Sequence, residues 1–190
     1  MARALLCSLF ALTLTLCSCS ESGAAPAEAK DAARAAFDSG DSNGALVVVN
    51  RALSQGADSA ALRLVAGEAC LQLERLGDAL AHAEVGLGGD ASGALAADLR
   101  WVEGAAAGRR FMQLGADDDW RRSNSALQVA ADSGSHRGEA AYLLTWLHTR
   151  PGKEDDARAL KYGRLCLSLN PGETVVGGVT KLLGERGLTP

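Results

Sequence analysis

The sequence predicts an all-α fold, an α-solenoid of about four helix-turn-helix repeats followed by a C-terminal capping helix. Three observations support this prediction. From residue 27 onward, helical patches alternate with short breaks of Gly, Asp, Ser or Pro. Small side chains recur on these patches at an interval of 34 residues. Aromatic residues make up only 4% of the chain, so helices must pack closely through small side chains rather than around large rings.

The nine expected helices follow one another with short breaks between them. They span residues 27–39, 42–55, 59–74, 77–88, 93–114, 118–132, 137–149, 154–169 and 173–185. Most breaks supply a residue that ends one helix and an Asp or Ser that can cap the next. The expected caps are Asp41, Asp58, Asp90, Asp117 and Ser135. Val47-Val48-Val49 favours a strand on its own, but its neighbours share one helical face, so a helix is predicted there.

Three sets of small residues share one spacing, a step of four residues and then a step of three. The sets are Ala45, Val49 and Ala52; Ala79, Ala83 and Gly86; and Ala159, Gly163 and Cys166. The first two sets are 34 residues apart, and Pro171 follows the last set by five residues. This pattern resembles the tetratricopeptide repeat (TPR), a helix-turn-helix unit with a 34-residue period. The resemblance covers nearly all of residues 27–171 and implies a curved stack of helix pairs.

The third repeat departs from this pattern. Its best set of small residues is Ser123, Leu127 and Ala130, and the helix at 93–114 is longer than the standard repeat helix. The register of this repeat therefore stays open. The helix at 173–185 places four apolar side chains on one face and is expected to cover the last repeat, as repeat arrays require.

The N-terminus predicts export. A positive start at residues 1–3 precedes an apolar run of about thirteen residues, too short for a membrane span of about twenty. Leu16-Cys17-Ser18-Cys19 resembles a bacterial lipobox. The resemblance implies a signal peptide over 1–18 and an acylated Cys19, which is the membrane anchor. Residues 19–26 then form a flexible tether, and 27–190 form the repeat domain. Plain secretion is the alternative.

The same resemblance implies a place in the bacterial cell envelope. In a Gram-negative host, Ser20 after the lipidated cysteine favours the outer membrane, on its periplasmic face. The sequence does not decide the Gram type or the oligomeric state.

Motifs for catalysis are missing from the sequence. The three histidines, His82, His136 and His148, have no metal-ligand spacing, and neither a nucleophile elbow nor a phosphate loop occurs. The run Asp117-Asp118-Asp119 begins a helix, where negative charge is stabilised, so a metal site is not expected. A net charge of −4 argues against nucleic acid as a partner. Cys70 and Cys166 are read as small buried residues rather than a disulfide. We therefore predict a protein that is not an enzyme and uses no cofactor.

The TPR resemblance implies a concave groove that binds an envelope protein or a peptide. Carrying the family's groove spacing onto this sequence selects a mixture of apolar and charged side chains, which suits protein recognition. The selected residues are Lys30, Arg34, Phe37, Asp38, Leu64, Glu68, Leu71, Gln72, Leu144 and His148. The alternative is that the apolar members belong to the core and the charged ones to a solvated face.

Two other functions stay open from the sequence. One is a small envelope hydrolase or ligand-binding protein with a pocket near the long helix at 93–114. It would need polar groups, the three histidines in particular, to converge on a cavity. The other is a structural protein that associates with itself through the ends of the solenoid.

Overall fold

In a computed structural model, the described residues, 26–169 and 172–190, form nine helices and no strand. The helices are α1 (Pro26–Asp38), α2 (Ser42–Ser54), α3 (Ala60–Gln72), α4 (Leu76–Gly88), α5 (Gly93–Leu114), α6 (Asp117–Asp132), α7 (Arg137–His148), α8 (Asp156–Ser168) and α9 (Glu173–Gly184). Their ends lie within two residues of the predicted ends, which confirms the all-α prediction. The predicted signal peptide, Cys19 and most of the tether lie outside the described residues.

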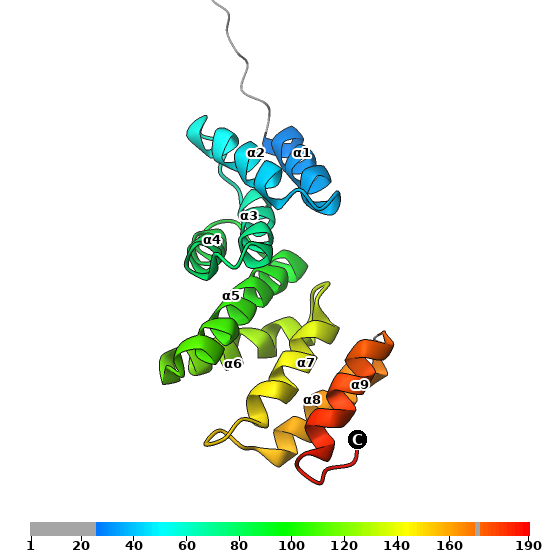
Figure 1. Cartoon of the computed structure of the whole chain (residues 1–190). Coiled ribbons are helices and arrows are strands. Elements are labelled where there is room, and N and C mark those ends of the chain that lie inside the picture. The colour runs from blue at the N-terminus through cyan, green and yellow to red at the C-terminus, as the bar shows by residue number, and fades with distance from the viewer. Residues whose placement is uncertain (1–25, 170–171) are drawn as a thin grey trace, which may run out of the picture.

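Consecutive helices pack in antiparallel pairs, and the pairs stack from α1 and α2 at one end to α8 and α9 at the other (Figure 1). Each odd-numbered helix also contacts the next odd-numbered one, from α1 through α3, α5 and α7 to α9. Across the described residues, no even-numbered helix makes a backbone contact with another even-numbered helix, although Arg122 Nη2 of α6 lies 3.6 Å from Glu84 Oε2 of α4. The even helices therefore spread on the outer, convex side. The odd helices form one continuous surface on the other side, which we call the inner face.

Among the described residues, the backbone contacts of the array join neighbouring helices and neighbouring repeats. Among the described residues, α1 and α2 make no contact with any helix beyond α3. Such a chain of nearest-neighbour interfaces defines a solenoid rather than a closed bundle. The predicted architecture of four helix pairs with a closing helix is thus confirmed.

The helix caps follow the sequence only in part. Asp41 caps α2 by accepting a hydrogen bond from the Gly44 amide at 2.8 Å, as predicted. Asp58 does not cap α3. Ser59 takes that role, and Asp58 instead accepts a hydrogen bond from Arg63 Nε at 2.8 Å.

Three more predicted caps have other positions. Asp90 Oδ1 accepts a hydrogen bond from the Ala60 amide at 3.1 Å, which links the end of α4 to the start of α3. Asp117 is the first residue of α6 rather than its cap, and His136 rather than Ser135 precedes α7. In these places the polar group contacts a neighbouring segment instead of capping its own helix. Either contact satisfies the hydrogen-bonding capacity of the carboxylate or amide.

Small residues allow the helices to approach closely. All nine members of the three spaced sets are buried, on α2, α4 and α8. The separate set of small residues in the third repeat is buried as well: Ser123, Leu127 and Ala130. A side chain at Gly104 in α5 would lie 2.6 Å from Leu127 Cγ, so this crossing of α5 and α6 requires glycine. Cys70 and Cys166 are both buried free thiols.

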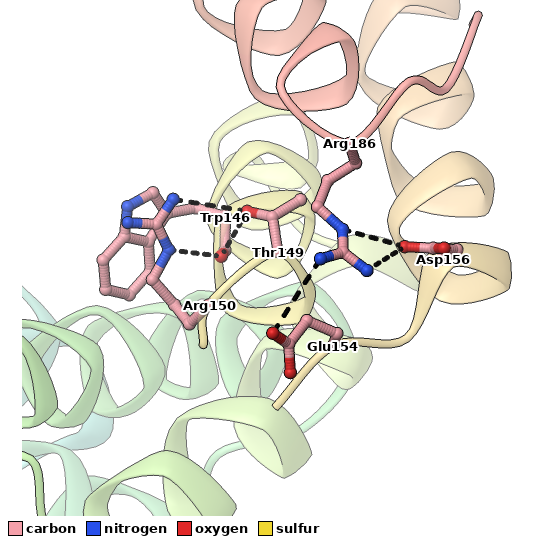
Figure 2. Close-up of polar contacts among 6 residues, drawn as sticks. All are labelled: Trp146, Thr149, Arg150, Glu154, Asp156 and Arg186. Carbon is pink, nitrogen blue, oxygen red and sulfur yellow. Dashed lines mark hydrogen bonds and ion pairs between the residues drawn. The ribbon is translucent and has the colours of Figure 1, made fainter. Parts of the chain in front are cut away.

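The last helix covers the end of the array. Val179 and Leu183 of α9 are fully buried and pack against Gly163 of α8. Figure 2 shows how Arg186, just after α9, reaches the start of α8. Its Nε and Nη2 lie 3.1 and 3.0 Å from Asp156 Oδ1, and Nη1 lies 3.8 Å from Glu154 Oε1. These contacts fix the end of α9 against the α7–α8 turn.

Candidate functional site

A chain of polar and aromatic contacts crosses the inner face. Arg34 Nη2 of α1 lies 2.6 Å from Glu68 Oε2 of α3. The other carboxylate oxygen of Glu68 is 3.2 Å from His136 Nε2, at the start of α7. The His136 ring stacks on Trp101 of α5, with 5.1 Å between ring centroids. Side chains of four successive odd-numbered elements are therefore linked, although α3 and α7 share no backbone contact among the described residues.

The protonation of His136 responds to this arrangement. The hydrogen bond with Glu68 raises the pKa of His136 above its usual value, and this effect outweighs burial, which lowers it. The charges of Glu68, Glu139 and Asp98 raise the pKa further. Because Glu68 is itself buried and also pairs with Arg34, a positive His136 balances the buried carboxylate. The contact is thus strongest when the imidazole is charged.

Next to this chain of contacts, a pocket of about 670 Å³ opens between α5, α7 and α9. Trp101 and Arg109 line it from α5, Tyr142 and Leu143 from α7, and Val175 from α9. The surface of the pocket is mostly apolar and includes a few polar groups, which is the usual composition of a ligand site. It lies against the helix at 93–114, where the sequence left a pocket open as an alternative.

The walls of the pocket are fixed by contacts outside it. The loop before α7 is held by Asp98 Oδ1, which accepts a hydrogen bond from the Ser135 amide at 2.7 Å. Gly134 in this loop has φ +92°, and a side chain there would lie 2.6 Å from the same Asp98 oxygen. Tyr142 lies against Gly178 of α9, where a side chain would meet its ring at 3.0 Å. The pocket is therefore pre-formed by α5, α7 and α9 together.

The charges at the pocket are mainly positive. Arg109 donates to the Leu71 carbonyl at 2.7 Å and to Glu74 Oε1 at 2.8 Å. Arg137 donates through Nε to the Ala131 carbonyl at 3.2 Å, and no described carboxylate lies within 4 Å of its nitrogens. The acidic residue in the lining is Glu139. Because Arg109 is paired with Glu74, Arg137 is the arginine of the lining that has no carboxylate partner among the described residues.

The predicted groove residues fall into two groups. Lys30, Arg34, Phe37, Asp38 and Gln72 keep exposed or half-exposed side chains on α1 and α3. Leu64, Glu68, Leu71, Leu144 and His148 are buried, each 8% exposed or less. In this structure, members of the second group cannot present their side chains to a partner, although Glu68 organises the inner face from within.

His148 belongs to an aromatic cluster in the core. Its ring stacks on Tyr162 at 6.1 Å and meets Trp120 edge-on at 6.0 Å. Burial lowers the pKa of His148, and neither ring nitrogen has a hydrogen-bond partner among the described residues. Burial therefore favours the neutral imidazole, and the ring packs within the core.

Sequence reasoning missed the pocket residues Arg109, Arg137, Tyr142 and Val175. The family's groove spacing does not select them: Arg109 lies in the long α5, where the register stayed open, and Val175 lies in the closing helix α9. One signal was present in the sequence. The bulky Trp101 occurs in a helix otherwise rich in Ala and Gly, where a large side chain needs space that its neighbours leave free.

The structure separates the three histidines. His82 lies 3.3 Å from Arg63 Nη1 on the α3–α4 pair, His136 contacts Glu68, and His148 is in the core. In the described region, no Ser, Thr or Cys side chain is hydrogen-bonded to any of them. The convergence that a hydrolase would need is thus not observed.

The acidic run at the start of α6 is paired with basic side chains. Asp117 Oδ1 lies 2.7 Å from Lys153 Nζ, Asp118 pairs with Arg121, and Asp119 Oδ2 lies 3.4 Å from Arg110 Nε. Over residues 26–169 and 172–190, no group of three or more His, Cys, Asp or Glu side chains is placed to hold a metal ion. Across the same residues, we find no helix with both the length and the apolarity that a membrane crossing requires.

Comparison with solved structures supports the fold. The crystal structure of the MamA protein superposes with a TM-score of 0.63 over 86% of this chain and 83% of the MamA chain, at 19% identity. No family model and no curated protein sequence matches the chain. At this identity the likeness concerns the fold alone. The protein is an α-solenoid of TPR-like helical repeats, the class to which MamA also belongs.

Proposed function

We propose that this protein is a non-catalytic scaffold that binds another protein of the bacterial cell envelope on its inner face. The observation that supports this proposal is the continuity of that face. Four repeats contribute to it, Arg34, Glu68 and His136 bridge them, and the pocket beside Trp101 opens on it. Aromatic and arginine side chains are the types that most often anchor a protein partner.

We also propose that an acylated Cys19 holds the scaffold at the membrane. The lipobox-like Leu16-Cys17-Ser18-Cys19 supports this proposal. The net charge of −4 gives no attraction to anionic lipid, so a covalent lipid would have to provide the anchor. In a Gram-negative host, Ser20 favours the outer membrane as the destination.

Cell fractionation tests the anchor. We expect the Cys19→Ser variant to move from the membrane fraction to the soluble fraction, while Cys17→Ser stays in the membrane fraction. A Cys19→Ser variant that fractionates like the natural chain would disprove lipid attachment at this residue.

Site-specific photo-crosslinking in the native cell tests the scaffold. Crosslinkers belong at exposed positions of the inner face, Asp38 and Glu139, with exposed Val47 on α2 as the matched outer position. Glu68 and Leu71 are unsuitable because both are buried, so their substitution would test folding instead. We expect a defined envelope protein to be captured from the two inner positions and not from Val47. Capture of the same abundant proteins from all three positions would refute the scaffold proposal.

A further inference from the structure

We infer that the pocket between α5, α7 and α9 binds an acidic peptide segment of the partner. An apolar side chain of the segment enters the pocket, and a carboxylate next to it in the sequence pairs with Arg137. This inference rests on the proposed function, because it names the chemistry of the partner that the inner face binds. It adds the position of the contact and the kind of segment that fits.

The size and walls of the pocket favour a peptide with a large apolar side chain. A volume of about 670 Å³ is within the range of ligand sites and exceeds what a single methyl-bearing side chain would fill. Trp101, Leu143 and Val175 provide apolar surface from three different helices. Burial of an aromatic or large aliphatic side chain there removes apolar area from water on both partners, which is the main source of affinity.

The pocket is prepared for binding before a ligand arrives. Trp101 is held by the stack on His136, and the loop at Ser135 is held by Asp98. Tyr142 is held against Gly178. Because these side chains are already ordered, a peptide would lose little binding energy to ordering the site. The closing helix α9 therefore does more than cover the array, since Val175 lines the pocket and Gly178 lies against Tyr142, which also lines it.

The charge of the pocket selects an acidic segment. Arg137 has its Nε engaged by the Ala131 carbonyl, while its terminal nitrogens have no carboxylate among the described residues. Arg109 on the α5 wall is already paired with Glu74 at 2.8 Å, so Arg137 is the cation that the inference uses. Glu139 is the acidic residue of the lining, and its carboxylate is 3.9 Å from His136 Nδ1, whose positive form offsets it. An arginine that is partly desolvated and unpaired is a strong site for a peptide carboxylate.

Fluorescence anisotropy on the purified protein tests the inference. The probe is a labelled short peptide of alternating phenylalanine and aspartate. One control peptide carries lysine in place of aspartate, and another carries serine in place of phenylalanine. We expect the first peptide to bind and both controls to bind at least about tenfold more weakly, equivalent to about 1.4 kcal/mol.

Four variants, in matched pairs, locate the peptide. Arg137→Gln removes the charge from the pocket, and Arg164→Gln removes the same charge from an exposed position on α8 outside it. Val175→Arg fills the pocket, and Val176→Arg places the same side chain on an exposed neighbour in α9 that does not line it. We expect about tenfold weaker binding for each pocket variant. We expect changes within about twofold for each control, because isolated surface substitutions have small effects.

Each result either supports or overturns the inference. Equal binding of the aspartate and lysine peptides, or equal effects within either pair of variants, would overturn it. If light scattering shows that the chain dimerises and Val175→Arg abolishes the dimer, the occupant is a second copy and the inference also fails. Should Val175→Arg fail to fold by circular dichroism, Arg137→Gln and the control peptides still decide the question.

The crosslinking experiment separates this inference from the proposed function. Capture of one partner from Asp38 that is unaffected by Val175→Arg would leave the scaffold standing and refute the pocket as its binding site. Absence of any specific partner at both inner positions would refute the scaffold, whatever the peptide measurements show.

Discussion

The crossing of α5 and α6 offers a quantitative test of the close helix packing that defines this fold. We consider the substitution Gly104→Ala. The new methyl group would lie 2.6 Å from Leu127 Cγ, 2.8 Å from Cδ2 and 3.1 Å from the Leu127 amide nitrogen. A change of rotamer can move the first two atoms away, but the amide nitrogen moves only with the whole of α6. The clash with the amide nitrogen is therefore removed only if α5 and α6 move apart.

The expected loss of stability combines two opposing effects. Overpacking a core costs about 1–3 kcal/mol. Because the clash here involves the backbone, we take a cost of about 3 kcal/mol. Alanine favours the helix over glycine by about 1 kcal/mol. The net loss in the free energy of unfolding is about 2 kcal/mol. For a chain of this size, that loss lowers the melting temperature by roughly 4–8 °C.

Gly177→Ala is the matched control for this substitution. Gly177 lies in the interior of α9, and a methyl group there would meet nothing within 4 Å. Only the helix preference changes, so we expect stability to rise by up to about 1 kcal/mol. Urea unfolding followed by far-ultraviolet circular dichroism measures both variants. If Gly104→Ala unfolds at the same urea concentration as Gly177→Ala, or at a higher one, the close contact of α5 with α6 is refuted.

Three further predictions concern pH and the closing helix. Burial lowers the pKa of His148, so below about pH 6.5 the unfolded chain binds a proton that the folded chain does not, and stability falls as pH falls. His148→Phe keeps the aromatic packing and should flatten this loss in urea unfolding between about pH 6.5 and 5; an unchanged slope would contradict it. His136 acts in the opposite direction: its raised pKa stabilises the fold fully below about pH 6.5 and less as pH rises through the folded value, so His136→Gln should remove that decline. Arg186→Ala should lower overall stability by less than about 1 kcal/mol, because its ion pairs are partly exposed, yet hydrogen exchange in α9 should speed up. A loss above about 2 kcal/mol would mean that the clamp stabilises more than the end of the array.

The sequence predicted the helices well, and the structure buries five of the ten side chains that it assigned to a groove. The spacing of Ala45, Val49 and Ala52 predicted a buried stripe correctly, because small residues at helical steps report directly on close packing. Leu144 and His148 were assigned to a groove by spacing carried over from a family, and both lie in the core. Periodicity shows which face of a helix is buried. It does not show which neighbouring helix covers that face.

By itself, the sequence determined the elements, the period and the class of fold. Glycine, aspartate and serine breaks end the helices through local backbone preferences, and small residues recur wherever two helices must touch. These effects act over a few residues, so the local sequence is enough to produce them. The lipobox-like segment also belongs to the sequence alone, since it is recognised as a linear motif.

Only the tertiary structure decided where the inner face and its pocket form. Glu68 and His136 are 68 residues apart in the chain, and they meet because α5 brings the start of α7 beneath α3. The pocket needs Trp101, Tyr142 and Val175 from three helices whose relative positions depend on the length of α5 and on the docking of α9. Such a surface arises from the summed geometry of several interfaces, and no local pattern encodes that sum.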